Sequence, residues 1–259
     1  MTGRLPAYLD TPGPIAIAHR GASRIHPENT MAAFEAAITL GYQYIETDVR
    51  LTRDDRLIIF HDNHLDRVTD KQGLIAGMDW PVIRKARVLG REPIPEFAEL
   101  LSSWPDLRLN IDPKSDAAVI PLMKLLREMN ALDRVCIGSF SGSRLRRIRQ
   151  TSGPNVCLSM GPFDVAKLRM TSLSLPGLSR LASRFNAACV QVPPRYRGIR
   201  IIDKAFIDRA HEINLKVHAW TINDEVEIKR LLGLGIDGIM SDDVHLLKAI
   251  FKQHNLWPE

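Results

Sequence analysis

The segment Tyr44-Ile45-Glu46-Thr47-Asp48-Val49 interrupts an apolar, β-branched run with two acidic residues. Such a run predicts a short, buried strand. Because side chains alternate across a strand, the spacing of two residues puts the carboxylates of Glu46 and Asp48 on one face. Seven further runs of this kind recur along the chain, at Ile15–Ala18, Leu107–Ile111, Val135–Ile137, Val156–Leu158, Ala188–Val192, Lys216–Trp220 and Gly238–Met240.

Helical patterns lie between these runs. Met31–Leu40 opens after Thr30, Ile120–Met129 carries leucines at helical spacing, and acidic residues from Asp224 onward open a third helix. Strands that alternate with helices predict βα units and a parallel sheet. Eight such units in 259 residues predict the α/β class and a single (β/α)8 barrel, which commonly takes about 250 residues. We expect residues 1–259 to form one domain.

One segment departs from this alternation. Leu57–Phe60 follows the first quoted strand so closely that no helix fits between them, which predicts a hairpin return or a bent continuation of that strand. Residues 62–106 then separate it from the next clear strand. We predict that this range, beginning after His61-Asp62, is an insertion with little regular structure.

Composition sets broad limits on the class of protein. A chain with 45% hydrophobic and 25% charged residues is typical of a soluble globular protein, and the net charge of +5 mildly favours anionic partners or simply a solvated surface. No apolar run reaches 18 residues and the start lacks a signal-peptide pattern, so we expect a cytoplasmic protein without a transmembrane segment. The three cysteines stand in apolar runs, which indicates buried thiols. The arginine run at 144–149 lacks interleaved aromatic residues, so nucleic acid is not expected as a partner, and the oligomeric state stays open.

Four strand ends carry polar side chains that a packed core would not place there. In a barrel the carboxyl ends of the strands meet at one mouth, so these residues are expected to lie close together. Three inward carboxylates would repel one another, and a hard divalent cation such as Mg²⁺ or Ca²⁺ would relieve that repulsion. Taken singly, each histidine could be structural and each acid could belong to a salt bridge. The four groups are His19-Arg20, Glu46 with Asp48, His61-Asp62, and Asn110 with Asp112 and Lys114.

Seven motifs in a fixed order make the sequence resemble the glycerophosphodiester phosphodiesterase family, within the superfamily of phospholipase C-like phosphodiesterases. They span nearly the whole chain, from 15 to about 245. The motifs are His19-Arg20-Gly21, Pro27-Glu28-Asn29-Thr30, Glu46-Thr47-Asp48-Val49, Phe60-His61-Asp62, Asn110-Ile111-Asp112-Pro113-Lys114, Trp220-Thr221-Ile222-Asn223 and Asp237-Gly238-Ile239-Met240-Ser241-Asp242.

The resemblance implies a barrel that hydrolyses deacylated phospholipids to glycerol 3-phosphate and an alcohol. It implies that His19 and His61 are the acid/base pair. It further assigns Glu46, Asp48 and Asp112 to one divalent cation, and Arg20 and Lys114 to the phosphate. Asp112 departs from the family, since many members carry glutamate there, and the choice between Mg²⁺ and Ca²⁺ stays open.

Four more residues receive supporting roles. We expect Asn29 and Asp62 to orient the catalytic histidines or their loop by hydrogen bonds, and Glu28 either to do the same or to support the start of a helix. Trp220 could form a wall of the glycerol or alcohol pocket, or it could be a core residue. Which histidine is the acid, and whether the nucleophile is water or a neighbouring glycerol hydroxyl, stays open.

Two rival functions are carried forward. A lysophospholipase D-type lipid phosphodiesterase could use the same barrel, with the leucine-rich segment Lys167–Phe185 as an apolar flap rather than an ordinary barrel helix. A non-catalytic barrel could instead bind anionic lipid or nucleic acid through basic faces. The intact set of His19, His61 and their acidic neighbours argues against the second rival.

Overall fold

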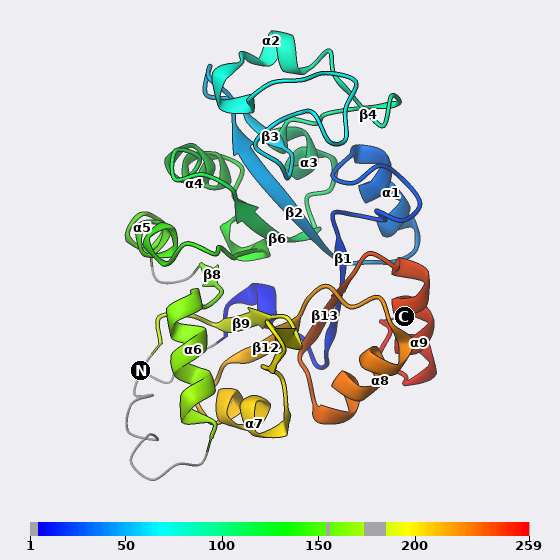
Figure 1. Ribbon diagram of the computed structural model, residues 1–259, viewed down its shortest axis with the longest axis vertical. Coiled ribbons are helices and arrows are strands. Elements are labelled where there is room, and N and C mark those ends of the chain that lie inside the picture. Colours follow the sequence, from blue (N-terminus) through cyan, green and yellow to red (C-terminus); the bar gives the residue numbers. More distant parts are fainter. Residues whose placement is uncertain (1–4, 154–155, 174–184, 259) are drawn as a thin grey trace.

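The computed structural model describes residues 5–153, 156–173 and 185–258, and these ranges form a nearly closed barrel of eight parallel strands (Figure 1). The strand order is β8-β7-β6-β2-β1-β13-β12-β9, and an isolated parallel bridge between Ser159 and Cys189 brings the last strand back to the first. The predicted α/β barrel is therefore confirmed. Its strands are β1 (Ile15–His19), β2 (Tyr44–Leu51), β6 (Arg108–Pro113), β7 (Val135–Ile137), β8 (Cys157–Leu158), β9 (Cys189–Val192), β12 (Lys216–Ala219) and β13 (Gly238–Ser241).

Helices cover the outside of the strands (Figure 1). Several begin at side-chain caps: the Thr30 hydroxyl accepts from the Ala33 N–H, and an aspartate caps each of the last three helices. Gly235, in the left-handed conformation, ends the helix that was predicted to start after Asp224. The helices are α1 (Met31–Thr39), α3 (Phe97–Ser103), α4 (Val119–Glu128), α5 (Gly142–Ser152), α6 (Pro162–Thr171), α7 (Lys204–Glu212), α8 (Glu225–Leu234) and α9 (Val244–Gln253).

The excursion after β2 has more regular structure than its sequence indicated. β3 (Leu57–Ile59) pairs antiparallel with β2, as a hairpin return does. The chain then forms η2 (Ile75–Gly77), α2 (Trp80–Ile83), and the short pair β4 (Arg87–Val88) and β5 (Glu92–Pro93), around a small apolar core of their own. The end of the range expected to be irregular is α3, whose Phe97 packs into the main core. α3 is too short to show a clear helical periodicity, and it adjoins an irregular segment, so the sequence did not predict it.

Three smaller features complete the fold. The hairpin of β10 (Arg195–Tyr196) and β11 (Ile199–Arg200) was not expected, and two further 3-10 turns are η1 (Ala7–Leu9) and η3 (Leu132–Arg134). Of the segment Lys167–Phe185, the first part ends α6, while residues 174–184 lie outside the described residues. Within the described ranges, no helix has the length and apolar character needed to cross a bilayer.

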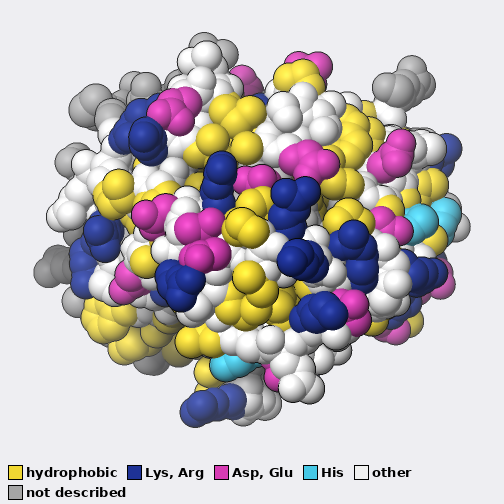
Figure 2. Space-filling view, turned by 90° about the horizontal axis from the view of Figure 1, so that it is seen from above, with side chains coloured by type: hydrophobic (Ala, Val, Ile, Leu, Met, Phe, Trp, Pro, Cys, Tyr) yellow, Lys and Arg dark blue, Asp and Glu magenta, His cyan; other side chains and the backbone are white. Residues whose placement is uncertain are grey.

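The surface carries both signs of charge. On the face seen in Figure 2, lysine and arginine side chains alternate with aspartate and glutamate instead of gathering in one basic patch. Arg144 of the basic run on α5 pairs with Asp116 at 2.8 Å.

Candidate active site

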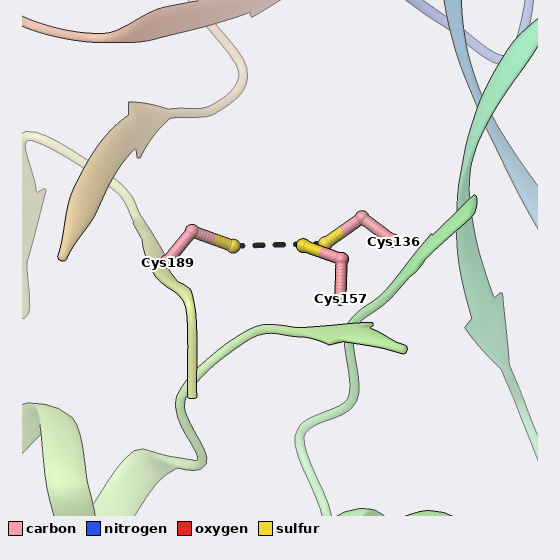
Figure 3. A group of neighbouring side chains, drawn as sticks. All are labelled: Cys136, Cys157 and Cys189. Carbon is pink, nitrogen blue, oxygen red and sulfur yellow. Dashed lines mark hydrogen bonds between the residues drawn. The ribbon is translucent and has the colours of Figure 1, made fainter. Parts of the chain in front are cut away.

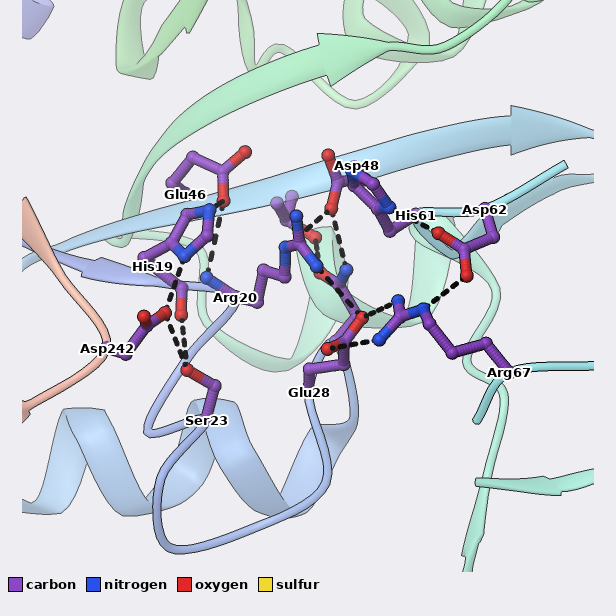
Figure 4. Close-up of polar contacts among 12 residues, drawn as sticks. His19, Arg20, Ser23, Glu28, Glu46, Asp48, His61, Asp62, Arg67 and Asp242 are labelled. Carbon is purple, nitrogen blue, oxygen red and sulfur yellow. Dashed lines mark hydrogen bonds and ion pairs between the residues drawn. The ribbon is translucent and has the colours of Figure 1, made fainter. Parts of the chain in front are cut away.

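His19 ends β1 and is held by a carboxylate from the neighbouring strand end. Its Nδ1 lies 2.6 Å from Oδ1 of Asp242, while its Nε2 lies 3.6 Å from Oε2 of Glu46 (Figure 4). Burial alone would lower the pKa of His19, but the charge of Glu46 and the hydrogen bond to Asp242 outweigh it and raise that pKa. Asp242 also accepts hydrogen bonds from Asn223 Nδ2 at 2.7 Å and Ser23 Oγ at 3.2 Å. Burial opposes these bonds, yet together with His19 they lower the pKa of Asp242 to about 2.

His61, just beyond β3, has the same kind of partner. Its Nδ1 lies 2.5 Å from Oδ1 of Asp62, and Arg67 donates to the other oxygen of that carboxylate. Burial opposes the shift, but the hydrogen bonds from Arg67 and His61 lower the pKa of Asp62 to about 2. Arg50 Nε donates to the backbone carbonyl of His61 at 3.0 Å. Two histidine–carboxylate dyads thus lie one on each side of the acids of β2 (Figure 4).

Glu46 and Asp48 point to the same face of β2, as the spacing predicted, and both are buried. They differ in the cations beside them. Asp48 contacts Lys114 Nζ at 2.6 Å and Arg20 Nε at 3.2 Å, and although burial opposes it, these charges hold its pKa below the usual range. Burial and the charge of Asp48 raise the pKa of Glu46 to about 7. Glu46 is therefore the acid whose negative charge is least compensated.

Asp112 lies on β6, which is paired with β2 so that Asp112 stands beside Asp48, and Lys114 directly follows the end of β6. Lys114 Nζ bridges the two carboxylates, at 2.6 Å from Asp48 and 2.7 Å from Asp112. Burial raises the pKa of Asp112 despite this contact. Hard carboxylate oxygens at Glu46, Asp48 and Asp112 are of the ligand type that Mg²⁺ or Ca²⁺ prefers. In the described residues, however, these three acids do not each bring an oxygen within 4.8 Å of the others. A cation that bound both Asp48 and Asp112 would compete with the Lys114 ammonium for their oxygens.

The loop after β1 is strained in a way that explains its motif. Arg20 and Asn29 both have positive φ, at 55° and 58°, and Gly21 has φ of 80°. A Cβ on Gly21 would lie 2.7 Å from the backbone carbon of Ala33, so only glycine fits there. This turn lets the Arg20 N–H approach Oε2 of Glu46 at 3.3 Å while its guanidinium reaches the opposite acid, Asp48.

The expected supporting residues tie this loop to the rest of the site. Asn29 is buried and donates to Asp48 at 2.8 Å, while its carbonyl accepts from Thr47 at 2.9 Å. Glu28 accepts from Arg20 at 3.0 Å and from Arg67 at 2.6 Å, so it links the first loop to the segment that carries His61. Glu28 precedes the helix cap at Thr30 and takes no part in the helix.

Trp220 packs partly against the apolar cluster inside the barrel. It follows β12, is half-buried, and meets the ring of Phe140 edge-on with centroids 5.6 Å apart. Phe140 itself is 70% exposed, although it follows an interior strand. The pair forms an aromatic wall between the loops after β7 and β12.

Several residues that complete the site received no role from the sequence. Asp242 and Asn223 stood inside recognised motifs. Asp242 directly follows β13 and His19 ends β1, so the strand-end rule could have identified Asp242. Ser23 and Arg67 had no such signal, because their partners are distant in sequence or on another loop. Their contacts depend on how the loops fold back over the barrel mouth.

The sequence and the fold both match known proteins. The family model for the glycerophosphoryl diester phosphodiesterase family matches residues 19–246. A probable glycerophosphodiester phosphodiesterase 2 of Mycobacterium tuberculosis is 36% identical over 253 residues, which cover 96% of this chain and 95% of that protein. A crystal structure of a glycerophosphoryl diester phosphodiesterase homologue from Silicibacter pomeroyi has a TM-score of 0.80 at 20% identity, covering 98% and 100% of the two chains.

A second solved structure is that of an Oleispira antarctica phosphodiesterase in complex with the product sn-glycerol-3-phosphate. It has a TM-score of 0.74 and 22% identity, and it covers 93% of this chain and 97% of that one. The family model spans both histidines, the acids of β2 and the Asn110–Lys114 motif. The chain belongs to the glycerophosphoryl diester phosphodiesterase family.

Proposed function

We propose that this enzyme hydrolyses glycerophosphodiesters to glycerol 3-phosphate and an alcohol, with His19 and His61 as acid and base and one divalent cation. The observation that carries the proposal is the pair of histidine–carboxylate dyads flanking the acids of β2. In each dyad the carboxylate engages Nδ1, so Nε2 is the ring nitrogen that could reach a substrate. In the resting site, Nε2 of His19 lies 3.6 Å from Glu46. The product bound to the Oleispira antarctica relative supports the choice of substrate class.

The cationic side chains suit an anionic diester. Arg20 is planar and can donate two parallel hydrogen bonds to phosphate oxygens, while Lys114 adds a mobile positive charge. Both now contact Asp48. Arrival of a phosphate would give these two side chains a new partner, whereas a cation on the acids would compete with them for Asp48. The resting ion pairs keep both side chains in position.

Glu46, Asp48 and Asp112 would hold the cation, Mg²⁺ or Ca²⁺. When bound, it supplies Lewis-acid polarisation of a phosphoryl oxygen. The raised pKa of Glu46 supports this assignment, because the buried carboxylate has too little positive charge around it to ionise readily near neutral pH. Asn29, which donates to Asp48, would fix the direction of that carboxylate.

The two histidines divide the proton transfers. One accepts a proton from the nucleophile, water or the neighbouring glycerol hydroxyl, and the other donates a proton to the departing alkoxide. Each transfer contributes about 10²–10⁴ in rate. Asp242 and Asp62 stabilise the protonated rings and select the tautomer, since each accepts from Nδ1.

A lysophospholipid is the rival substrate on the same site, with the aromatic wall of Phe140 and Trp220 as an apolar contact for an acyl chain. The cytoplasmic location likewise stays a prediction. The mixed charges of Figure 2 do not favour the non-catalytic, polyanion-binding rival.

Parallel assays of glycerophosphocholine and lysophosphatidylcholine test the proposal. We expect hydrolysis of the water-soluble diester, its loss in EDTA, and recovery with Mg²⁺ or Ca²⁺. Full turnover in EDTA would refute the cation, and a preference for the lysolipid would favour the rival. His61→Ala should lose activity, whereas His64→Ala, an exposed histidine three residues away, should keep it.

A further inference from the structure

Three cysteines meet inside the barrel, away from the acidic group. Cys136, Cys157 and Cys189 come from β7, β8 and β9, are at most 1% exposed, and point their sulfurs toward one another (Figure 3). They are free thiols, and they are all the cysteines that the chain has. Strand pairing explains part of this arrangement, because Cys136 and Cys157 are register partners.

The sulfur positions match a metal centre closely. The Sγ atoms of Cys136 and Cys189 are 3.6 Å apart, and all three sulfurs lie within 4.8 Å of one another. Zn²⁺–sulfur bonds of about 2.3 Å put the sulfurs of a tetrahedral or trigonal site about 3.8–4.0 Å apart. Shifts of about an ångström or less would therefore bring all three thiolates onto one ion.

Two buried polar atoms on residues that neighbour these cysteines lack a hydrogen-bond partner among the described residues. The cysteines belong to an apolar cluster with Tyr8, whose hydroxyl is fully buried and has no hydrogen-bond partner among the described residues. An unpaired buried hydroxyl is unfavourable, and a metal-bound thiolate is a better acceptor for it than a neutral thiol. His218, on the next strand beyond Cys189, also has a buried Nε2 without a partner in the described chain.

The cluster also sits at the weakest join of the barrel. β8 and β9 meet through an isolated bridge between Ser159 and Cys189, with flanking backbone hydrogen bonds of 2.9 Å from Met160 and Ala188. Cys157 and Cys189 lie on opposite sides of this join. An ion bound to both would connect two strands that share few hydrogen bonds.

We propose that Cys136, Cys157 and Cys189 form a three-thiolate site for one soft d10 cation of the Zn²⁺ class, which fastens β9 to β8. Thiolates select such ions over the Mg²⁺ and Ca²⁺ suited to carboxylates, so the two sites differ in ligand chemistry. Binding releases the thiol protons to solvent and needs no oxidant. Because the sulfurs are buried, the ion would enter as the chain folds.

Cadmium provides a direct probe. Full-length reduced protein is refolded with one equivalent of Cd²⁺, and thiolate-to-cadmium charge-transfer absorption is followed in the ultraviolet. We expect one Cd²⁺ per chain with this absorption, and slower amide exchange at Met160 and Ala188 in the loaded protein. Asp48→Asn, which removes an acid of the other site and keeps every thiol, should bind Cd²⁺ in the same way.

Cys157→Ser should lose most of the absorption. If that variant does not fold, the wild-type signal still decides, since no other thiol exists in the chain. Refolded wild type that binds no Cd²⁺, or binds it without thiolate absorption, overturns the proposal. A disulfide between Cys136 and Cys189 in the reduced preparation, or full absorption in Cys157→Ser, overturns it as well.

Discussion

Glu46→Gln should stabilise the metal-free enzyme at alkaline pH while it removes activity. The pKa of Glu46 is raised from 4.5 to about 7, first by burial and then by the charge of Asp48. A group whose folded pKa is raised contributes its full stability below its unfolded pKa and loses it as the pH rises through the folded value. In the metal-free protein, ionisation of Glu46 should therefore lower the free energy of unfolding progressively between about pH 4.5 and 7.

The size of the effect follows from the shift. A change of about 2.5 pKa units corresponds to at most about 3 kcal/mol in the free energy of unfolding. A glutamine keeps an acceptor oxygen near the Arg20 N–H but carries no charge. At pH 8 in EDTA, Glu46→Gln should be more stable than wild type by up to about 3 kcal/mol, and the difference should shrink toward pH 5.

Urea unfolding at pH 5 and pH 8, with and without Mg²⁺ or Ca²⁺, measures this difference. Glu28→Gln is a matched control for which the opposite change in stability is expected. Burial opposes the shift, but Arg67 and Arg20 lower the pKa of Glu28, so its charge stabilises the fold above the unfolded pKa. That variant should lose stability at pH 8. Added cation should stabilise wild type more than Glu46→Gln. A Glu46→Gln protein less stable than wild type at pH 8 in EDTA would refute the reasoning.

Two further changes test the dyad and the loop. Asp242→Asn replaces a carboxylate that accepts from His19 with an amide that can accept at only one atom. The kcat on glycerophosphocholine should therefore fall about 10²-fold or more. Because Asp242 raises the pKa of His19, the part of the pH–rate profile that reports His19 should move to lower pH. Asp243→Asn is the control: it makes the same change one residue away, at a helix cap where asparagine serves as well, and should keep kcat. A near-wild-type kcat in Asp242→Asn would count against the dyad. Gly21→Ala should lower the urea midpoint, by about 1–3 kcal/mol in stability, because its Cβ would collide with the backbone of α1. Gly90→Ala, at φ of 70° with open space around its Cβ, should lower the stability less. Equal losses in the two variants would show that the backbone conformation alone, and not the collision, sets the loss.

Much of the barrel could be predicted because its strands are continuous apolar runs. Parallel strands that are buried on both faces have such sequences. The acids of β2 could be placed on one face because the period of a strand is two residues. The same rule placed Asp112 and Lys114 on one face. These are local properties, and the chain carries them within a few residues.

The rest depends on contacts between distant segments. Asp242 reaches His19 only because β13 pairs with β1 when the barrel closes, 223 residues away along the chain. Arg67 bonds both Asp62 and Glu28 because the insertion folds back over the first loop. α3 was missed because one short helix beside an irregular segment has too few turns to show its period.

The division of labour between His19 and His61 is the central claim, and an activated leaving group tests it most directly. A p-nitrophenyl diester of glycerol phosphate releases an anion that needs no proton, so the histidine that acts as the acid is not required for it. His19→Ala and His61→Ala should each lose about 10²-fold or more on glycerophosphocholine. On the nitrophenyl diester, one variant should recover most of its rate and the other should not. Wild-type rates in both variants, or equal losses by both on both substrates, would contradict the account.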